Sequence, residues 1–219
     1  MSSAAQSALQ IFTEIAETKR MWTAVEGDLP RNSQGACLVV TSAARGEGKS
    51  LVAAGFGILA ARLSRKRVVV ADLNWHRPAL QDFFDLQPAF DLSRLRQATP
   101  VADLAQPCGT NGLAVLTAPI MSGDEAARMQ GADGELGRAV VGHLRASFDL
   151  VIVDAASVFP ANRNMMDPVA LSHDADGVAM VVLANVTPRQ EVKRARMTLE
   201  TSGARVLGLV LNQWQNPVC

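Results

Sequence analysis

The sequence predicts an α/β protein in which a mostly parallel, twisted sheet carries helices on both faces. Six short apolar runs recur along the chain, and helix-length stretches separate most of them. Runs that are apolar throughout are typical of parallel strands buried on both faces, which right-handed crossovers connect. The length of 219 residues suits one domain core rather than two. The predicted strands are 37–41, 67–72, 113–117, 150–154, 178–183 and 206–211.

Residues 1–30 precede the first strand and predict an N-terminal helical segment. We expect this segment either to pack on the core or to mediate self-association, and we expect the remaining chain, 31–219, to form the main domain. Apolar side chains at helical spacing give the segment one hydrophobic face, which more often docks on its own core than on a partner. That face is predicted to contain Leu9, Ile11, Phe12, Ile15 and Trp22.

The first strand leads into a turn with glycines and then into a helix that opens at Gly48-Lys49-Ser50, which fits a Walker A phosphate-binding loop. Backbone N–H groups and the positive helix end surround phosphates in such a loop. Lys49 is predicted to reach the β- and γ-phosphates, and Ser50 to hold Mg²⁺. The alternative is a turn with glycines and a surface lysine. The predicted nucleotide-binding residues here are Ala44, Arg45, Gly46, Glu47, Gly48, Lys49, Ser50 and Leu51.

Two further strands end in a carboxylate. Asp154 closes strand 150–154 in the Walker B arrangement and is predicted to hold Mg²⁺ directly or through water. Asp72 closes strand 67–72 and is predicted to orient an attacking water or hydroxyl, or to bind the metal. With Lys49 these aspartates form the predicted catalytic set. The alternative for Asp154 is a helix cap or a turn former, and the alternative for Asp72 is a turn aspartate.

Composition excludes several classes of protein. The formal net charge is zero, which gives little attraction for a polyanion, so we expect no direct nucleic-acid binding. No stretch of about 18 apolar residues occurs, so we expect a cytoplasmic chain. The three cysteines and the three histidines share no metal-ligand spacing.

These motifs resemble the bacterial tyrosine kinases of capsule and exopolysaccharide export, the CpsD/CapB type, within the MinD/ParA-like group of P-loop ATPases. The resemblance extends over nearly the whole chain and implies ATP or ADP with Mg²⁺ as cofactors. It also implies that Asn212, directly after the last predicted strand, lies near the adenine. Ala44 stands where MinD/ParA proteins carry a signature lysine, which disfavours a Min-type or partitioning ATPase.

The sequence departs from this family at several positions. Ala43 replaces the usual first glycine of the loop, and Asn74 replaces the second aspartate of the family's Asp-x-Asp motif. Glu17 and Arg20 fit a self-association motif whose last arginine is Thr23 here. The chain contains no tyrosine, so we expect no autophosphorylation on tyrosine.

The resemblance implies an ATP-binding cytoplasmic protein, or one peripheral at the inner face of the cell membrane. Its implied partner is the cytoplasmic segment of a membrane polysaccharide copolymerase, and the chain is expected to form a homo-oligomer. Three hypotheses stay open: an ATPase or kinase-like regulator of export, a ParA/MinD-like positioning ATPase, and a pseudokinase that binds ATP without turnover.

Overall fold

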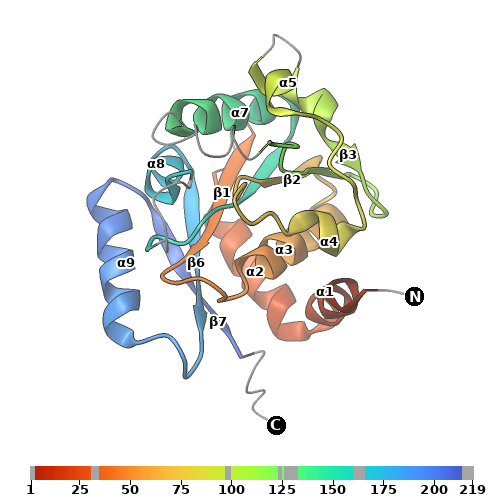
Figure 1. Ribbon diagram of the computed structural model, residues 1–219. Helices are drawn as coiled ribbons and strands as arrows, with labels where there is room; N and C mark the ends of the chain where they lie inside the picture. The colour runs from red at the N-terminus through yellow and green to blue at the C-terminus, as the bar shows by residue number, and fades with distance from the viewer. Residues whose placement is uncertain are drawn as a thin grey trace.

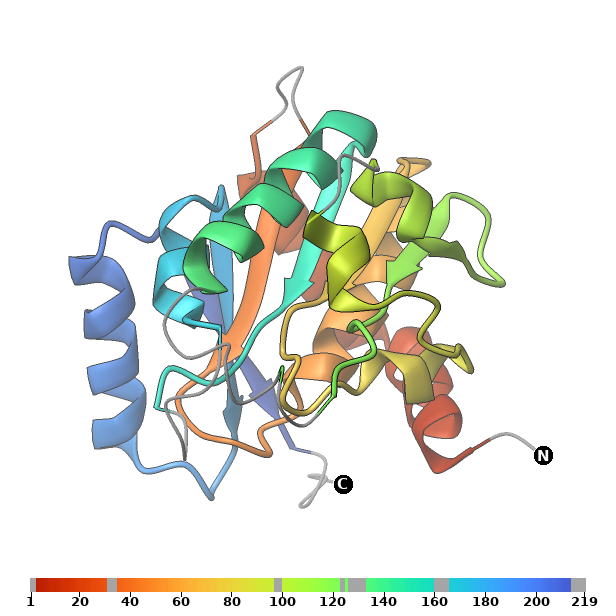
Figure 2. The same ribbon diagram turned by 45° about the horizontal axis from the view of Figure 1, so that its top comes forward.

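A central twisted sheet lies between two layers of helices (Figures 1 and 2). The computed structural model describes residues 3–30, 35–96, 100–122, 125, 133–159 and 166–213. The sheet has the strand order β3-β4-β2-β5-β1-β6-β7, and only the β3–β4 pairing is antiparallel in its described part. The strands are β1 (Ala36–Ser42), β2 (Val68–Asp72), β3 (Gln106–Pro107), β4 (Leu113–Leu116), β5 (Leu150–Asp154), β6 (Gly177–Leu183) and β7 (Val206–Asn212).

The structure confirms the predicted fold class. All six predicted strands are present, and their ends differ from the predicted ones by no more than one residue. Strand β3 was not predicted, because two residues are too few to show a periodicity. The helices are α1 (Ala4–Glu14), α2 (Ala16–Asp28), α3 (Lys49–Ser64), α4 (Leu80–Phe84), α5 (Leu92–Arg96), the 3-10 helix η1 (Val101–Leu104), α7 (Asp133–Ser147), α8 (Pro168–His173) and α9 (Arg189–Thr201).

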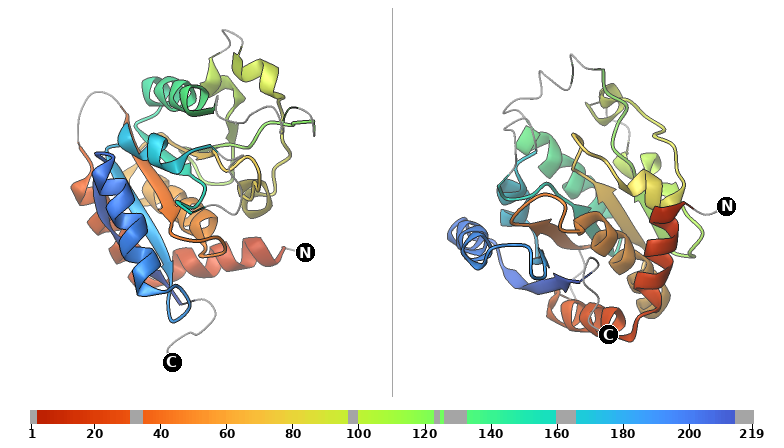
Figure 3. Two further views of the ribbon diagram at one scale, coloured as in Figure 1. Left: turned by 60° about the vertical axis from the view of Figure 1, so that its left-hand side comes forward. Right: turned by 60° about the horizontal axis from the view of Figure 1, so that its bottom comes forward.

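The two faces of the sheet build two separate hydrophobic cores. Alternate residues of each central strand point to opposite faces, so one strand contributes to both cores. The α7-side core includes Leu144 of α7, Leu171 of α8 and Leu199 of α9. The α3-side core includes Leu9 of α1 and Phe56 of α3. Figure 3 shows α9 on one side of the sheet and the N-terminal helices on the other.

Two N-terminal helices, rather than one, pack against α3. The Phe12 ring lies so close to Gly55 that a Cβ there would stand 2.4 Å from the ring, so only glycine permits this approach. Trp22 is fully buried, and its ring centroid lies 5.5 Å from that of Phe56. These contacts bury one face of the N-terminal segment on the α3-side core.

The predicted hydrophobic face of this segment was wrong at two positions. Ile11 is 53% exposed and Ile15 is 42% exposed. Ile11 lies two residues from Leu9, which places it on the opposite side of the helix. Ile15 has extended backbone angles between α1 and α2, so the helical repeat is interrupted there. Glu17 and Arg20 are exposed, and their role in self-association stays a prediction.

Candidate nucleotide-binding site

All of the predicted site residues lie at one edge of the sheet, where the parallel strands end. Ligands of such sheets bind beyond the carboxyl ends of the strands. Lys49 and Ser50 begin α3, directly after the loop that follows the central strand β1. Asp72, Asp154 and Asn212 are the last residues of β2, β5 and β7.

Two glycines of the predicted phosphate-binding loop adopt positive φ angles. Gly46 has φ 84° and Gly48 has φ 90°, which is the left-handed region that side chains disfavour. Ala43 replaces the usual first glycine without a positive φ and is fully buried in the α7-side core. The loop therefore accommodates alanine at this position. The N-terminus of α3, a helix of 16 residues, lies directly after the loop.

Glu47 connects this loop to the turn between β6 and α9. Its carboxylate is buried, with 2% of the residue exposed, and its Oε2 accepts a hydrogen bond from the Ala44 N–H at 2.6 Å. Its Oε1 accepts hydrogen bonds from the Leu183 N–H, at 3.3 Å, and from the Thr187 hydroxyl. Since a buried carboxylate is costly without such donors, these three contacts fix the shape of the loop.

We expect Glu47→Gln to destabilise the protein by about 1–3 kcal/mol, because an amide group places N–H donors where the carboxylate accepts. The measurement is urea denaturation of the protein without nucleotide, with exposed Glu135→Gln as the matched control. Equal unfolding midpoints for the Glu47 variant and the control variant would contradict this role.

Asn212, the last residue of β7, is hydrogen-bonded to the same loop. Its Nδ2 donates a hydrogen bond to the Glu47 carbonyl oxygen at 3.0 Å. A Cβ on Gly48 would lie 2.3 Å from this Nδ2, so the glycine is needed for the close approach. A pocket of about 210 Å³ adjoins these residues, and its lining residues are Ala5, Ala8, Gly46, Gly48, Leu51, Phe83, Leu183 and Asn212.

Asp154 is a fully buried carboxylate without an ordinary hydrogen bond. Neither of its oxygens receives a hydrogen bond of normal geometry from the described residues. Burial raises the pKa of Asp154, and the negative charge of Asp72 adds to this effect. The Ser50 hydroxyl and the Lys49 ammonium lie close enough to oppose the rise in pKa. Because burial still raises the pKa despite these two groups, a further cation beside Asp154 would stabilise its charged form.

Asp72 lies beside Asp154 in the register of the sheet, yet its surroundings differ. Its Oδ2 accepts hydrogen bonds from the N–H groups of Ala79, at 2.9 Å, and Leu80, at 3.1 Å, at the start of α4. Its Oδ1 accepts one from the Asn74 N–H at 3.1 Å. Burial raises the pKa of Asp72, although these three bonds oppose the rise. The bond from Asn74, two residues further along, shows that Asp72 also stabilises the turn after β2, which was the alternative interpretation of this residue.

Lys49 is a buried cation near the carboxylates of Asp154 and Glu47. It is buried, and burial lowers its pKa, while the negative charges of Asp154 and Glu47 favour the protonated form. The described residues contain no cluster of three or more His, Cys, Asp or Glu side chains that could hold a metal ion. Mg²⁺ sites of nucleotides need only one or two protein ligands besides phosphate oxygens and water, so Asp154 and Ser50 fit such a site.

Thr117 was overlooked in the sequence. It follows β4 directly, it is 1% exposed, and its hydroxyl has no hydrogen-bond partner among the described residues. The signal that identified Asp72 and Asp154, a polar residue at the end of an apolar strand, was also present at Thr117.

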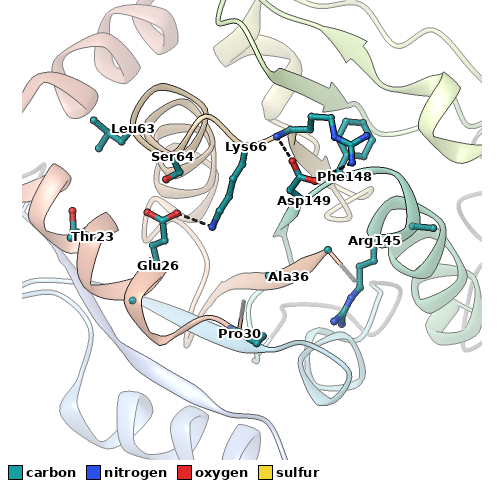
Figure 4. A pocket seen from close by; sticks show the side chains of 14 residues that line it. Thr23, Glu26, Pro30, Ala36, Leu63, Ser64, Lys66, Arg145, Phe148 and Asp149 are labelled. Carbon is teal, nitrogen blue, oxygen red and sulfur yellow. Dashed lines mark hydrogen bonds and ion pairs between the residues drawn. The ribbon is translucent and has the colours of Figure 1, made fainter. Parts of the chain in front are cut away.

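A second cleft, of about 800 Å³, lies at the opposite, amino end of the strands. Figure 4 shows Lys66 pointing toward Glu26, and Lys66 Nζ lies 2.8 Å from Glu26 Oε1. Arg67 Nη2 lies 3.0 Å from Asp149 Oδ1. Arg145 also pairs with a carboxylate, that of Asp176, at 2.8 Å. Because these cations are already neutralised, we do not assign an anion site to this cleft.

The sheet order, the loop after the central strand and the two adjacent aspartates define a P-loop fold of the MinD/ParA type. The solved structure of the septum site-determining protein MinD with Mg-ADP from Pyrococcus horikoshii OT3 has this fold, with a TM-score of 0.68, 16% identity and coverage of 84% of this chain and 72% of that chain. No helix in the described part of the chain is long and apolar enough to cross a membrane.

Relatives found by sequence indicate a narrower group of proteins than the fold does. The tyrosine-protein kinase YwqD of Bacillus subtilis is 25% identical over 176 residues, which cover 80% of this chain and 71% of YwqD. The succinoglycan biosynthesis transport protein ExoP of Rhizobium meliloti is 27% identical over 203 residues, which cover 90% of this chain but only 25% of ExoP.

The structure of the chimerical protein CapA2B2 matches with a TM-score of 0.72 and 22% identity, over 90% of this chain and 83% of that chain. No protein-family model matches the chain. These relatives confirm the resemblance to the CpsD/CapB-type tyrosine kinases of polysaccharide biosynthesis that the sequence motifs predicted.

Proposed function

We propose that this chain binds ATP with Mg²⁺ and, through its nucleotide state, regulates a membrane polysaccharide copolymerase from the cytoplasmic side. The observation that carries the nucleotide assignment is Asp154, a fully buried carboxylate that receives no hydrogen bond of normal geometry from the described residues and lies near Lys49 and Ser50 at the start of α3. Mg²⁺, when bound there, would neutralise phosphate charge. The polysaccharide context is supported by the name of ExoP, a succinoglycan biosynthesis transport protein.

Each residue of the site has a proposed part in binding. The N–H groups at the start of α3 and the Lys49 ammonium bind the β- and γ-phosphates. Asp154 and Ser50 hold the metal ion, and Asp72 orients the attacking hydroxyl. The adenosine end of the nucleotide occupies the pocket beside Asn212, where α1 forms one wall.

The absence of tyrosine from these 219 residues supports a regulator that does not phosphorylate itself on tyrosine. Asn74 also favours a second candidate, a protein that binds ATP without turnover. The Asn74 Nδ2 donates to the Arg77 carbonyl oxygen at 3.2 Å, so this amide helps to shape the loop after β2 but cannot take a proton.

The test measures Mg-ATP affinity by calorimetry and phosphate release, for the wild type and for Asn74→Asp. We expect micromolar or tighter binding, about −8 kcal/mol or more favourable. Turnover that appears only in Asn74→Asp would identify the native chain as a pseudoenzyme, whereas no binding by either protein would refute the nucleotide assignment. ATP-dependent pull-down with the cytoplasmic segment of a copolymerase tests the partner.

A further inference from the structure

Buried side-chain oxygens without a hydrogen-bond partner gather in one region of the protein. Among the described residues they belong to Asp154, Asn74, Gln81 and Thr117. Asp154 and Thr117 lie at the carboxyl ends of β5 and β4, Asn74 follows the end of β2, and Gln81 lies in α4, whose first N–H groups bind Asp72. Buried polar atoms without partners are uncommon, so their concentration at one edge of the sheet points to a ligand.

Thr117 lies level with the two aspartates of the site. In the parallel register Ala71 is opposite Leu116, so the next residues, Asp72 and Thr117, are neighbours. Asp72 is in turn opposite Asp154 on its other side. The three polar residues therefore form a row across β4, β2 and β5, with adjacent strands about 4.8 Å apart.

The three side chains of this row also point to the same face of the sheet. Each of them is flanked along the chain by two residues that belong to the α7-side core, so each projects to the opposite face. The flanking residues are Ala71, Leu73, Leu116, Ala118, Val153 and Ala155. The opposite face is the one that α3 covers, and α3 begins with Lys49 and Ser50.

Asp72 can still accept one hydrogen bond from a ligand. A carboxylate offers about four lone-pair positions, and three N–H groups donate to the Asp72 carboxylate, which leaves about one position. The Thr117 hydroxyl can donate or accept, and the Asn74 Oδ1 can only accept. Together these groups suit a small hydroxyl, which both donates and accepts.

We propose that Thr117 and Asn74 hold, beside Asp72, the hydroxyl group that receives the γ-phosphoryl group of ATP. This proposal depends on the nucleotide binding proposed above. In the transfer, the hydroxyl oxygen forms a bond to the γ-phosphorus, the bond from that phosphorus to the β–γ bridging oxygen breaks, and its electron pair leaves with ADP. The hydroxyl proton passes to the Asp72 carboxylate. Thr117 acts as a positioning residue for the oxygen.

Thr117→Val tests this assignment, because valine keeps the shape of the side chain and removes its hydroxyl. We expect the melting temperature without nucleotide to stay the same or to rise by about 2–4 °C, since an unpaired buried hydroxyl is lost. We expect Mg-ADP affinity to change less than about 2-fold, but affinity for Mg-ADP with aluminium fluoride, which holds an in-line oxygen, to fall roughly 10-fold. Thr117→Ser should restore it.

The control is Thr110→Val, a half-buried threonine that precedes the opposite end of β4. A wild type that binds no Mg-ADP refutes nucleotide binding itself. The hydroxyl site alone is refuted if the wild type binds Mg-ADP but does not bind Mg-ADP with aluminium fluoride. It is also refuted if Thr117→Val and the wild type bind Mg-ADP with aluminium fluoride equally tightly. Phosphate release identifies the source of the hydroxyl. If Thr117→Val loses both phosphate release and affinity for the aluminium fluoride complex, the hydroxyl belongs to water. If the aluminium fluoride complex depends on Thr117 but the wild type releases no phosphate, the hydroxyl belongs to another molecule.

Discussion

Lys49→Ala is expected to weaken Mg-ATP binding by roughly 10- to 100-fold, which corresponds to about 1.5–3 kcal/mol for lost charge-assisted hydrogen bonds. Lys49 is 7% exposed and begins α3, at the positive end of that helix, where the phosphates are proposed to bind. No other cation of the described loop is buried, since Arg45 is exposed. The loss should be larger for ATP than for ADP, because the γ-phosphate adds charge at this position.

Isothermal calorimetry with both nucleotides checks this result. The matched control is Lys193→Ala, which removes an exposed lysine of α9. Melting curves without nucleotide separate binding from folding: burial already lowers the pKa of Lys49, so its removal should cost little stability. Wild-type affinity in a folded Lys49→Ala protein would contradict the phosphate-binding role.

The sequence predicted the positions of the strands well because these strands are buried on both faces. Their continuous apolar runs, such as 150–154, contrast sharply with the polar residues that follow. The central position of β1 and the pairing of β2 with β5 could not be predicted, because strand order depends on contacts between segments that lie far apart in the sequence.

Part of the candidate site could be predicted because its residues lie in local sequence motifs. Local motifs identified Lys49, Ser50 and Asp154, because a glycine turn and a strand end are visible in the sequence. The role of Glu47 as a brace depends on Thr187, 140 positions further along, and no local pattern announces such a contact. The row with Thr117 likewise becomes visible only once the register places β4 beside β2.

The position of the N-terminal segment depends on the pocket beside the loop as well as on hydrophobic packing. The helical spacing predicted one apolar face, but the break at Ile15 turns the segment into two helices with different neighbours. Helix α1 reaches the pocket beside the phosphate-binding loop through Ala5 and Ala8, whose small side chains leave this pocket open. The segment therefore forms one wall of this pocket as well as part of the core.

Asp154→Asn is expected to make the protein more stable without nucleotide and to remove its response to Mg²⁺. The wild-type carboxylate is fully buried and lacks a hydrogen bond of normal geometry from the described residues, so an amide of the same shape relieves an uncompensated charge. Because Asn cannot supply negative charge to a cation, Mg²⁺ should no longer raise the affinity of the variant for ATP. Calorimetry with and without Mg²⁺ measures this second effect.

The stability difference should depend on pH in a definite direction. The folded-state pKa of Asp154 is raised above its ordinary value of 3.8, so the folded protein retains a proton that the unfolded chain releases. The wild type therefore loses stability as the pH rises from about 4 towards the folded pKa, whereas Asp154→Asn has no such group to titrate. The advantage of the variant should be small at pH 4 and largest at pH 8 or above, with a shift in melting temperature of about 2–4 °C for each kcal/mol.

Melting curves of both proteins between pH 4 and pH 9, without nucleotide, check this dependence. Asp72 titrates in the same region and is present in both proteins, so the difference between the two curves isolates Asp154 and its coupling to Asp72. Saturating Mg-ATP should reverse the order of stability at pH 8, because only the wild type gains a cation beside its carboxylate. A variant less stable than the wild type at every pH would show that Asp154 stabilises the empty protein, and the metal site would then have to lie elsewhere.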